Sequence, residues 1–197
     1  MPALTRAVLL AAAIAAAHTW RQPHQALGAD PPNAYLIELP AEQRTRFRNT
    51  DGSCVQCSLS MAGVAANVPA AQTLLWASEF GPALRGGSDP ARVTAYCNAR
   101  AIKAWNVTGP QTTAWVLWAL RTGRPAAITW GPAHMITALG ISDDGQHIAV
   151  CDNNSPQRID WVTIQQFTAR HQSYRGGWAI ILDTPRPAGP SSYTAWW

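Results

Sequence analysis

The spacing of the apolar residues changes near residue 123, and this change limits the fold more than any other feature of the chain. Residues 53–122 repeat their apolar positions every three to four residues, which predicts helices. Residues 125–184 instead contain short apolar runs separated by turn signals, which predicts strands. Helices followed by strands are typical of the α+β class. We therefore expect a single α+β domain over residues 46–184.

Four helices are predicted in the first half of this domain. Ser53 followed by Gln56 forms a capping box, so the first helix should begin at Cys54 and end before Pro69. The other three helices are expected to begin at Pro69, at Pro90 with Ser88 or Asp89 as its cap, and at Thr112 or Thr113, the last one ending at Gly123.

Four strands are predicted in the second half, over residues 126–130, 134–141, 146–151 and 177–183. The sequence Ser142-Asp143-Asp144-Gly145 separates the second strand from the third and is a turn signal. These two strands should therefore pair as a hairpin. A short helix is also expected at residues 163–171, before the last strand.

The two ends of the chain carry different signals. Residues 1–17 combine a positive residue with an apolar run that ends in alanines, which is typical of a secretory signal peptide; cleavage after Gly28 extends it to residues 1–28. Residues 18–45 are expected to be a linker or a strap, and residues 185–197 a flexible tail that ends in two tryptophans. The expected location is secreted, periplasmic or in the cell envelope, with no membrane span after signal removal.

Composition argues against a nucleic-acid partner. The formal net charge is +4, and the 15 Lys and Arg residues are scattered apart from Arg44, Arg46 and Arg48. A charged fraction of 13% with 10 tryptophans also argues against disorder. The Cys and His residues do not form two paired clusters, so neither zinc nor another cofactor is expected.

Cys54 is the centre of the functional prediction. The first turn of a helix is where the positive end of the helix dipole stabilises a thiolate. His134 opens one predicted strand and Asp152 ends its partner, so the hairpin should bring the carboxylate within reach of the imidazole. A thiolate, an imidazole and an orienting carboxylate are the parts of a nucleophilic cysteine hydrolase. Asn153 or Asn154 is an alternative to Asp152 as the orienting group.

Several short motifs surround these residues: Gly52-Ser53-Cys54, the run from Cys54 through Leu59 to Met61, the segment from His134 to Gly140, and Val150-Cys151-Asp152. Together they resemble the papain-like cysteine peptidase superfamily, and in their local detail its bacterial C39-like peptidases. The resemblance covers roughly residues 47–184. It implies a papain-like fold, a triad of Cys54, His134 and Asp152, and a peptide or protein substrate.

The resemblance also implies an oxyanion hole. The family usually carries Gln five or six residues before the nucleophile, where this chain has Asn49 and Arg48. Asn49 has the same amide chemistry on a shorter arm, so we expect it to bind the oxyanion together with the Cys54 backbone N–H. The resemblance further implies a disulfide between Cys57 and Cys97, whereas the four cysteines by themselves allow three full pairings.

Other interpretations stay open from the sequence. A non-catalytic papain-like module that binds peptide, glycan or an envelope component fits the altered oxyanion position. A cell-wall peptidase of the NlpC/P60 type would use His147 beside His134. Cys54 and Cys57 have the spacing of a thiol–disulfide exchanger, and Cys54 can equally be a structural cysteine. Trp130, four residues before His134, is a candidate for the wall of a substrate pocket.

Overall fold

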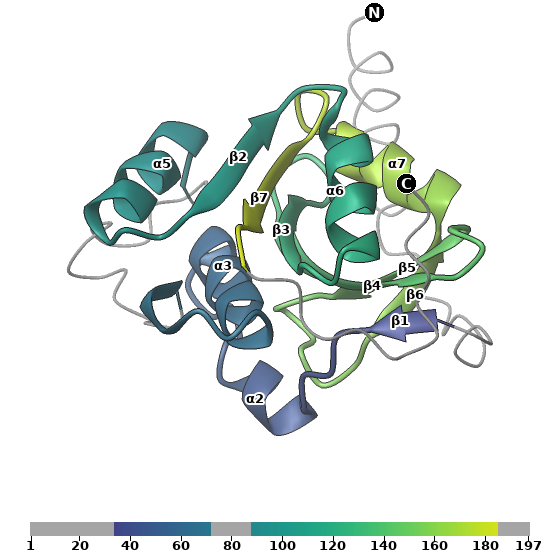
Figure 1. Ribbon diagram of the computed structural model, residues 1–197, viewed down its shortest axis with the longest axis horizontal. Helices are drawn as coiled ribbons and strands as arrows, with labels where there is room; N and C mark the ends of the chain where they lie inside the picture. The colour runs from purple at the N-terminus through teal and green to yellow at the C-terminus, as the bar shows by residue number, and fades with distance from the viewer. Residues whose placement is uncertain (1–33, 72–87, 185–197) are drawn as a thin grey trace, which may run out of the picture.

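The computed structural model describes residues 34–71 and 88–184, which form an α+β fold around one seven-stranded antiparallel sheet (Figure 1). The strand order is β2-β7-β3-β4-β5-β6, and β1 pairs with β4. The strands are β1 (Ala34–Leu36), β2 (Ala104–Thr108), β3 (Ala126–Thr129), β4 (Met135–Ser142), β5 (His147–Cys151), β6 (Asp160–Thr163) and β7 (Trp178–Leu182). The helices are α2 (Ala41–Thr45), α3 (Cys54–Ala65), the 3-10 turn η1 (Pro69–Ala71), α5 (Pro90–Ala99), α6 (Thr112–Arg121) and α7 (Ile164–Gln172). The predicted α+β class is confirmed.

Strand β4 is the centre of the sheet. β3 pairs with its first half and β1 with its second half, while β5 pairs along it with a register shift between Ala138 and Gly140. Gly140 lies where β1 approaches most closely, since a Cβ atom at this position would be 2.5 Å from the backbone oxygen of Tyr35. Glycine at this position therefore allows β1 to pair with β4.

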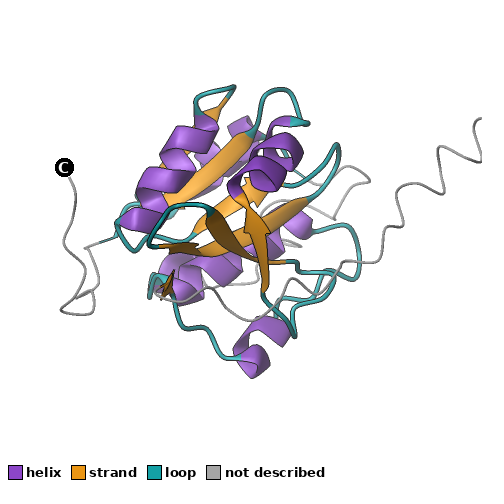
Figure 2. Ribbon diagram, turned by 90° about the vertical axis from the view of Figure 1, so that its right-hand side faces the viewer, coloured by secondary structure: helices purple, strands orange, loops and turns teal. Residues whose placement is uncertain are grey.

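Alternate residues of the central strands face two different helical layers. In β7, Ile181 belongs to a core cluster shared with α6 and α7, whereas Ile180 belongs to a cluster shared with α3. Helices accordingly lie on both sides of the strands in Figure 2. A third cluster, which includes Met61 and Leu139, covers the other side of α3, so this helix is buried over most of its length.

Most of the predicted elements are confirmed. α3 begins at Cys54, α5 begins at Pro90 with Asp89 as its side-chain cap, and α6 begins at Thr112. The four predicted strands correspond to β3, β4, β5 and β7, and β4 and β5 form the expected hairpin. The short predicted helix is α7, which follows a complete capping box at Thr163.

The predicted capping box at Ser53 is wrong, although α3 begins where it indicated. The Ser53 hydroxyl donates to Asp51 Oδ1 at 2.5 Å and lies 3.5 Å from Cys57 Sγ, so it does not cap the helix. Gln56 is buried, and its Oε1 has no hydrogen-bond partner in the described part of the chain. Burial of residues 54–63 on both sides, rather than a cap, accounts for the helix at this position.

Several elements were not predicted. β1 and α2 lie within the segment expected to be a linker or strap, and β2 interrupts the half expected to be helical.

The second predicted helix appears as η1, and its continuation over residues 72–87 lies outside the described residues. The predicted signal peptide and aromatic tail, within residues 1–33 and 185–197, also lie outside them. No helix in the described ranges is long and apolar enough to cross a membrane.

The disulfide expected between Cys57 and Cys97 is not formed, and all four cysteines are free and buried. Cys57 packs in the same cluster as Cys151, whereas Cys97 packs in the cluster on the other side of α3. Burial raises the pKa of each of these three thiols to about 11. They are therefore protonated at neutral pH, as expected of structural thiols.

The buried residue His171 joins α7 to α6 and β3. Its Nε2 lies 2.9 Å from Thr112 Oγ1, and its Nδ1 lies 3.2 Å from the carbonyl oxygen of Thr129. The ring stacks on Phe167 with 5.3 Å between the ring centroids. Burial lowers the pKa of His171, because a charged imidazolium would lose its hydration there.

We expect His171→Gln to reduce the loss of stability that accompanies acidification below about pH 6.5. The unfolded chain binds a proton on this ring near its ordinary pKa of about 6.5, while the folded protein keeps the ring neutral to lower pH. The contribution of the neutral ring to the free energy of unfolding is therefore fully present above about pH 6.5 and decreases as the pH falls. Urea unfolding over this range measures the slope, and equal slopes for wild type and variant would contradict the expectation.

Candidate active site

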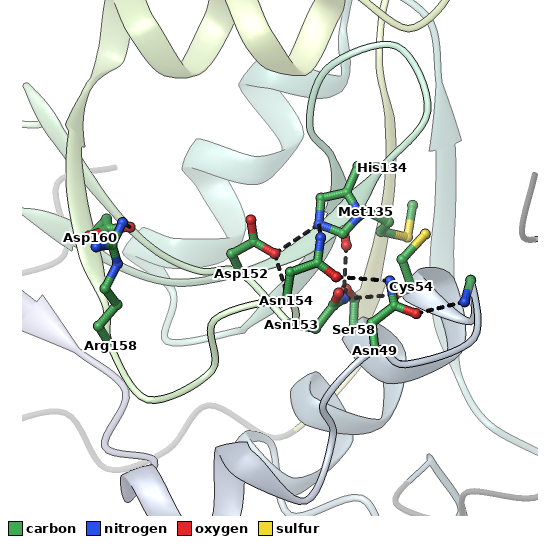
Figure 3. Close-up of polar contacts among 11 residues, drawn as sticks. Asn49, Cys54, Ser58, His134, Met135, Asp152, Asn153, Asn154, Arg158 and Asp160 are labelled. Carbon is green, nitrogen blue, oxygen red and sulfur yellow. Dashed lines mark hydrogen bonds and ion pairs between the residues drawn. The ribbon is translucent and has the colours of Figure 1, made fainter. Parts of the chain in front are cut away.

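The β4–β5 hairpin brings His134 and Asp152 to the same end of the sheet (Figure 3). His134 directly precedes β4, and Asp152 directly follows β5. His134 Nε2 lies 2.8 Å from Asp152 Oδ1, and the two side chains are 21% and 20% exposed. The backbone N–H of Trp130 donates to the His134 carbonyl oxygen at 2.9 Å, which closes the loop before the histidine. The predicted imidazole and carboxylate therefore form a pair at a partly exposed position.

Cys54 is the first residue of α3, which packs against β4. The residue is 7% exposed, and in Figure 3 its side chain extends from the helix toward the side of the site where His134 lies. Because Nε2 of His134 faces Asp152, Nδ1 is the ring nitrogen that remains for the thiol. The structure thus brings together a thiol, an imidazole and a carboxylate from three different elements.

The electrostatics of the site favour a charged His134. Burial by itself lowers the pKa of this ring, but hydrogen bonds and charges from Asp152 and Cys54 outweigh burial and raise the pKa of His134 to about 9. At neutral pH the ring is therefore an imidazolium between a carboxylate and a sulfur. A cation beside a cysteine favours the thiolate form, which is the nucleophilic one.

The three residues that follow β5 contact three different parts of the site. Asp152 Oδ1 faces the His134 ring and also accepts the Asn154 backbone N–H at 2.8 Å. Asn154 Nδ2 is more distant from the ring, at 3.3 Å from His134 Nε2. Asn153 is fully buried between α3 and β4. Of the three candidates for the orienting group, Asp152 therefore makes the shortest contact with the imidazole.

Asn49, the expected oxyanion donor, forms hydrogen bonds with Asn153 and Asn154 in the turn after β5. Its Nδ2 donates to Asn154 Oδ1 at 3.0 Å, its Oδ1 accepts the Gly52 backbone N–H at 3.0 Å, and its backbone N–H donates to the Asn153 carbonyl oxygen at 2.9 Å. A side-chain amide carries two N–H groups, so the bond to Asn154 leaves a second one. The structure thus places Asn49 beside the site, with one of its donors already used.

The buried residue Arg44 supports the same region, although in the sequence it belonged only to a short basic concentration. Its Nε donates to the Pro156 carbonyl oxygen and its Nη2 to that of Gln157, each at 2.9 Å, while its Nη1 donates to Leu39. These bonds hold the loop that follows Asp152. Arg44 and Pro156 are 112 positions apart, so no local pattern indicated the contact.

The alternative role of His147 beside His134 does not fit the structure. His147 lies at the other end of β5 from Cys151, opposite Thr163 of β6. Four residues of strand correspond to roughly 13 Å. His147 therefore does not join the His134 site, which removes the basis for the NlpC/P60 interpretation.

Trp130 belongs to the core rather than to an open pocket wall. It is 9% exposed, with Phe167 at 6.4 Å between ring centroids and the Arg170 guanidinium 5.1 Å from its ring.

Cys54 and Cys57 are both free, so the structure contains no exchanger-type bridge between them. Among residues 34–71 and 88–184, no group of three His, Cys, Asp or Glu side chains is arranged to hold a metal ion.

Comparisons with family models, curated proteins and solved structures found similarity among the solved structures. No protein-family model matches the chain, and no curated protein matches it. Among solved structures, it is similar to a double-glycine motif protease from an AMS/PCAT transporter, crystallised in complex with the leader peptide. The sequence identity is 16%, the match covers 70% of this chain and 89% of that chain, and the TM-score is 0.48.

Proposed function

We propose that this protein is a papain-like cysteine hydrolase that cleaves a peptide or a related amide, with Cys54 as nucleophile, His134 as acid–base and Asp152 as orienting carboxylate. The observation that carries the proposal is the 2.8 Å contact between His134 Nε2 and Asp152 Oδ1 beside the first turn of α3. The raised pKa of His134, to about 9, supports a thiolate–imidazolium pair at neutral pH.

The first half of the reaction forms an acyl-enzyme. The Cys54 thiolate attacks the carbonyl carbon of the scissile amide, forming a C–S bond while the carbonyl electrons move to oxygen. The Cys54 backbone N–H is in the first helical turn, where it has no intrahelical acceptor, and with the second N–H of Asn49 it binds the oxyanion. His134 then gives its Nδ1 proton to the leaving amine as the C–N bond breaks.

The second half releases the acyl group. Neutral His134 takes a proton from a water molecule, which attacks the thioester and restores the thiolate and the imidazolium. Throughout the cycle, Asp152 accepts the Nε2–H hydrogen bond and keeps Nδ1 directed at the reacting atoms. The carboxylate therefore fixes both the tautomer and the orientation of the ring.

Cleavage of a diverse peptide mixture tests the proposal. Wild-type protein is expected to produce new peptide termini, and acid quenching is expected to trap a thioester on Cys54 that mass spectrometry detects. Cys54→Ala should do neither, whereas Cys97→Ala, which removes a buried thiol on α5, should do both. A folded wild-type protein that neither cleaves nor becomes acylated would instead favour the non-catalytic binding module.

A further inference from the structure

We propose that Asn153 is a positioning residue that sets the spacing between the Cys54 thiol and the His134 ring. The inference rests on the proposed function, but it concerns a side chain that takes no part in the chemical steps described above. Asn153 is fully buried, and its side-chain amide donates to the backbone beside both reacting groups and to the Ser58 hydroxyl.

The contacts of Asn153 join α3 to β4 at the site itself. Its Nδ2 donates to three acceptors, which are Ser58 Oγ at 2.8 Å, the Met135 carbonyl oxygen at 2.9 Å and the Cys54 carbonyl oxygen at 3.0 Å. Cys54 is the first residue of α3, and Met135 is the first residue of β4, directly after His134. One side-chain amide therefore links the backbone of the nucleophile to the backbone next to the acid–base residue (Figure 3).

The orientation of the amide supports this role. Its Oδ1 is buried and has no hydrogen-bond partner among the described residues. Reversing the amide would place Oδ1 against the carbonyl oxygens of Cys54 and Met135, which are acceptors. Leaving a buried acceptor unpaired is unfavourable, so an apolar side chain of similar size would fill the space with less loss. The two N–H donors are therefore the property that distinguishes asparagine at this position.

The neighbours of Asn153 fix the other side of the same geometry. Asp152 binds the His134 ring, and the Asn153 carbonyl oxygen accepts the Asn49 backbone N–H at 2.9 Å. The Asp152 carboxylate thus holds the His134 ring, while the Asn153 amide holds both the start of β4 and the start of α3. Reacting groups that depend on such contacts are sensitive to small displacements, since an error of about 1 Å can lower a rate by roughly 10²-fold.

The fold does not depend on Asn153 alone, which makes the role testable. Apolar clusters pack α3 against the sheet, and the Thr137 hydroxyl donates to the Ser58 carbonyl oxygen at 3.2 Å, also joining β4 to α3. We therefore expect loss of the Asn153 donors to change the spacing of the site while α3 stays packed on the sheet.

The test uses Asn153→Leu, which keeps the branching and the number of side-chain heavy atoms, removes both donors and adds no charge. Asn106→Leu is the matched control: the Asn106 Nδ2 donates to the Pro90 carbonyl oxygen at 2.6 Å and to Thr94 Oγ1 at 2.7 Å, joining β2 to α5, and its Oδ1 accepts the Trp178 indole N–H at 2.5 Å. Two quantities are measured on folded protein: the rate at which iodoacetamide alkylates Cys54 at each pH, and the NMR titration of the His134 ring.

In the wild type we expect His134 to titrate near pH 9, as its raised pKa indicates. Asn153→Leu should move this midpoint toward the ordinary value of about 6.5 and slow the alkylation of Cys54 at neutral pH, because the imidazolium is less populated and less well placed beside the sulfur. Asn106→Leu should leave both quantities at wild-type values. Asn153→Ser, which keeps one donor on a smaller side chain, should give an intermediate result and replaces the leucine variant if that variant does not fold.

Two negative results have different meanings. A folded Asn153→Leu or Asn153→Ser variant with the wild-type His134 midpoint and alkylation rates would overturn the positioning role and leave the proposed function intact. A wild-type protein in which His134 titrates near the ordinary value of about 6.5, and Cys54 reacts no faster than a free thiol, would overturn the proposed function itself.

Discussion

Replacing either Cys54 or His134 with alanine is expected to lower kcat for a cleaved peptide by on the order of 10⁶-fold, the scale seen when a serine peptidase loses its nucleophile or its base. Without the thiol no acyl-enzyme forms. Without the imidazole, nothing holds a positive charge beside the sulfur or protonates the leaving amine. Steady-state cleavage of a peptide found in the library experiment measures the loss, with Cys97→Ala as the control that keeps activity.

The two substitutions should not be additive, because the thiol and the imidazole act as one unit. The double variant Cys54→Ala, His134→Ala is expected to retain the same residual activity as either single variant. If the losses multiplied in the double variant, the two residues would be acting independently. That result would contradict the thiolate–imidazolium pair, even if both single variants were strongly impaired.

Asp152→Asn is expected to lower kcat by about 10⁴-fold and to change its pH dependence. Asp152 is a principal reason that the pKa of His134 is raised to about 9, so the amide should let it fall toward about 6.5. The alkaline limit of activity, where the imidazolium is lost, should therefore move from about pH 9 to lower pH. Asp160→Asn removes a carboxylate paired with Arg158 at 3.2 Å and serves as the control that keeps the alkaline limit.

The same substitution should change stability with a defined sign. A ring whose folded pKa is raised to about 9, above an unfolded value of about 6.5, stabilises the fold fully below the lower value and loses that contribution as the pH rises through the higher one. Asp152→Asn should therefore flatten the pH dependence of stability in this window. An alkaline limit and a stability profile that are both unchanged would show that the carboxylate does not control the ring.

The parts of the site that were predictable from the sequence are those fixed by local structure. The turn at residues 142–145 sets the pairing of β4 with β5, and this pairing alone brings His134 and Asp152 together. The start of α3 at Cys54 was also predictable, although the cap that indicated it is absent. A helix that is buried on both sides depends little on its cap. The predicted start of α3 was therefore right, but the capping box from which it was predicted does not form.

The remaining parts depend on contacts between distant segments. Arg44 reaches Pro156 across 112 positions, and Asn153 reaches Cys54 across 99, so neither contact leaves a periodic signal in the sequence. β2 was hidden because all of its residues are only partly buried or exposed, which weakens the alternation of apolar side chains. The Cys57–Cys97 pairing failed because these residues pack in different clusters, which spacing along the chain does not indicate.

Site-resolved alkylation with iodoacetamide, from about pH 4 to about pH 9, tests the proposed thiolate–imidazolium pair most directly. We expect Cys54 to be labelled selectively at neutral pH, because burial raises the pKa of Cys57, Cys97 and Cys151 to about 11. His134→Ala should remove this labelling while the protein stays folded. Labelling of Cys54 that is absent in the wild type, or that is the same with and without His134, would contradict the proposed pair.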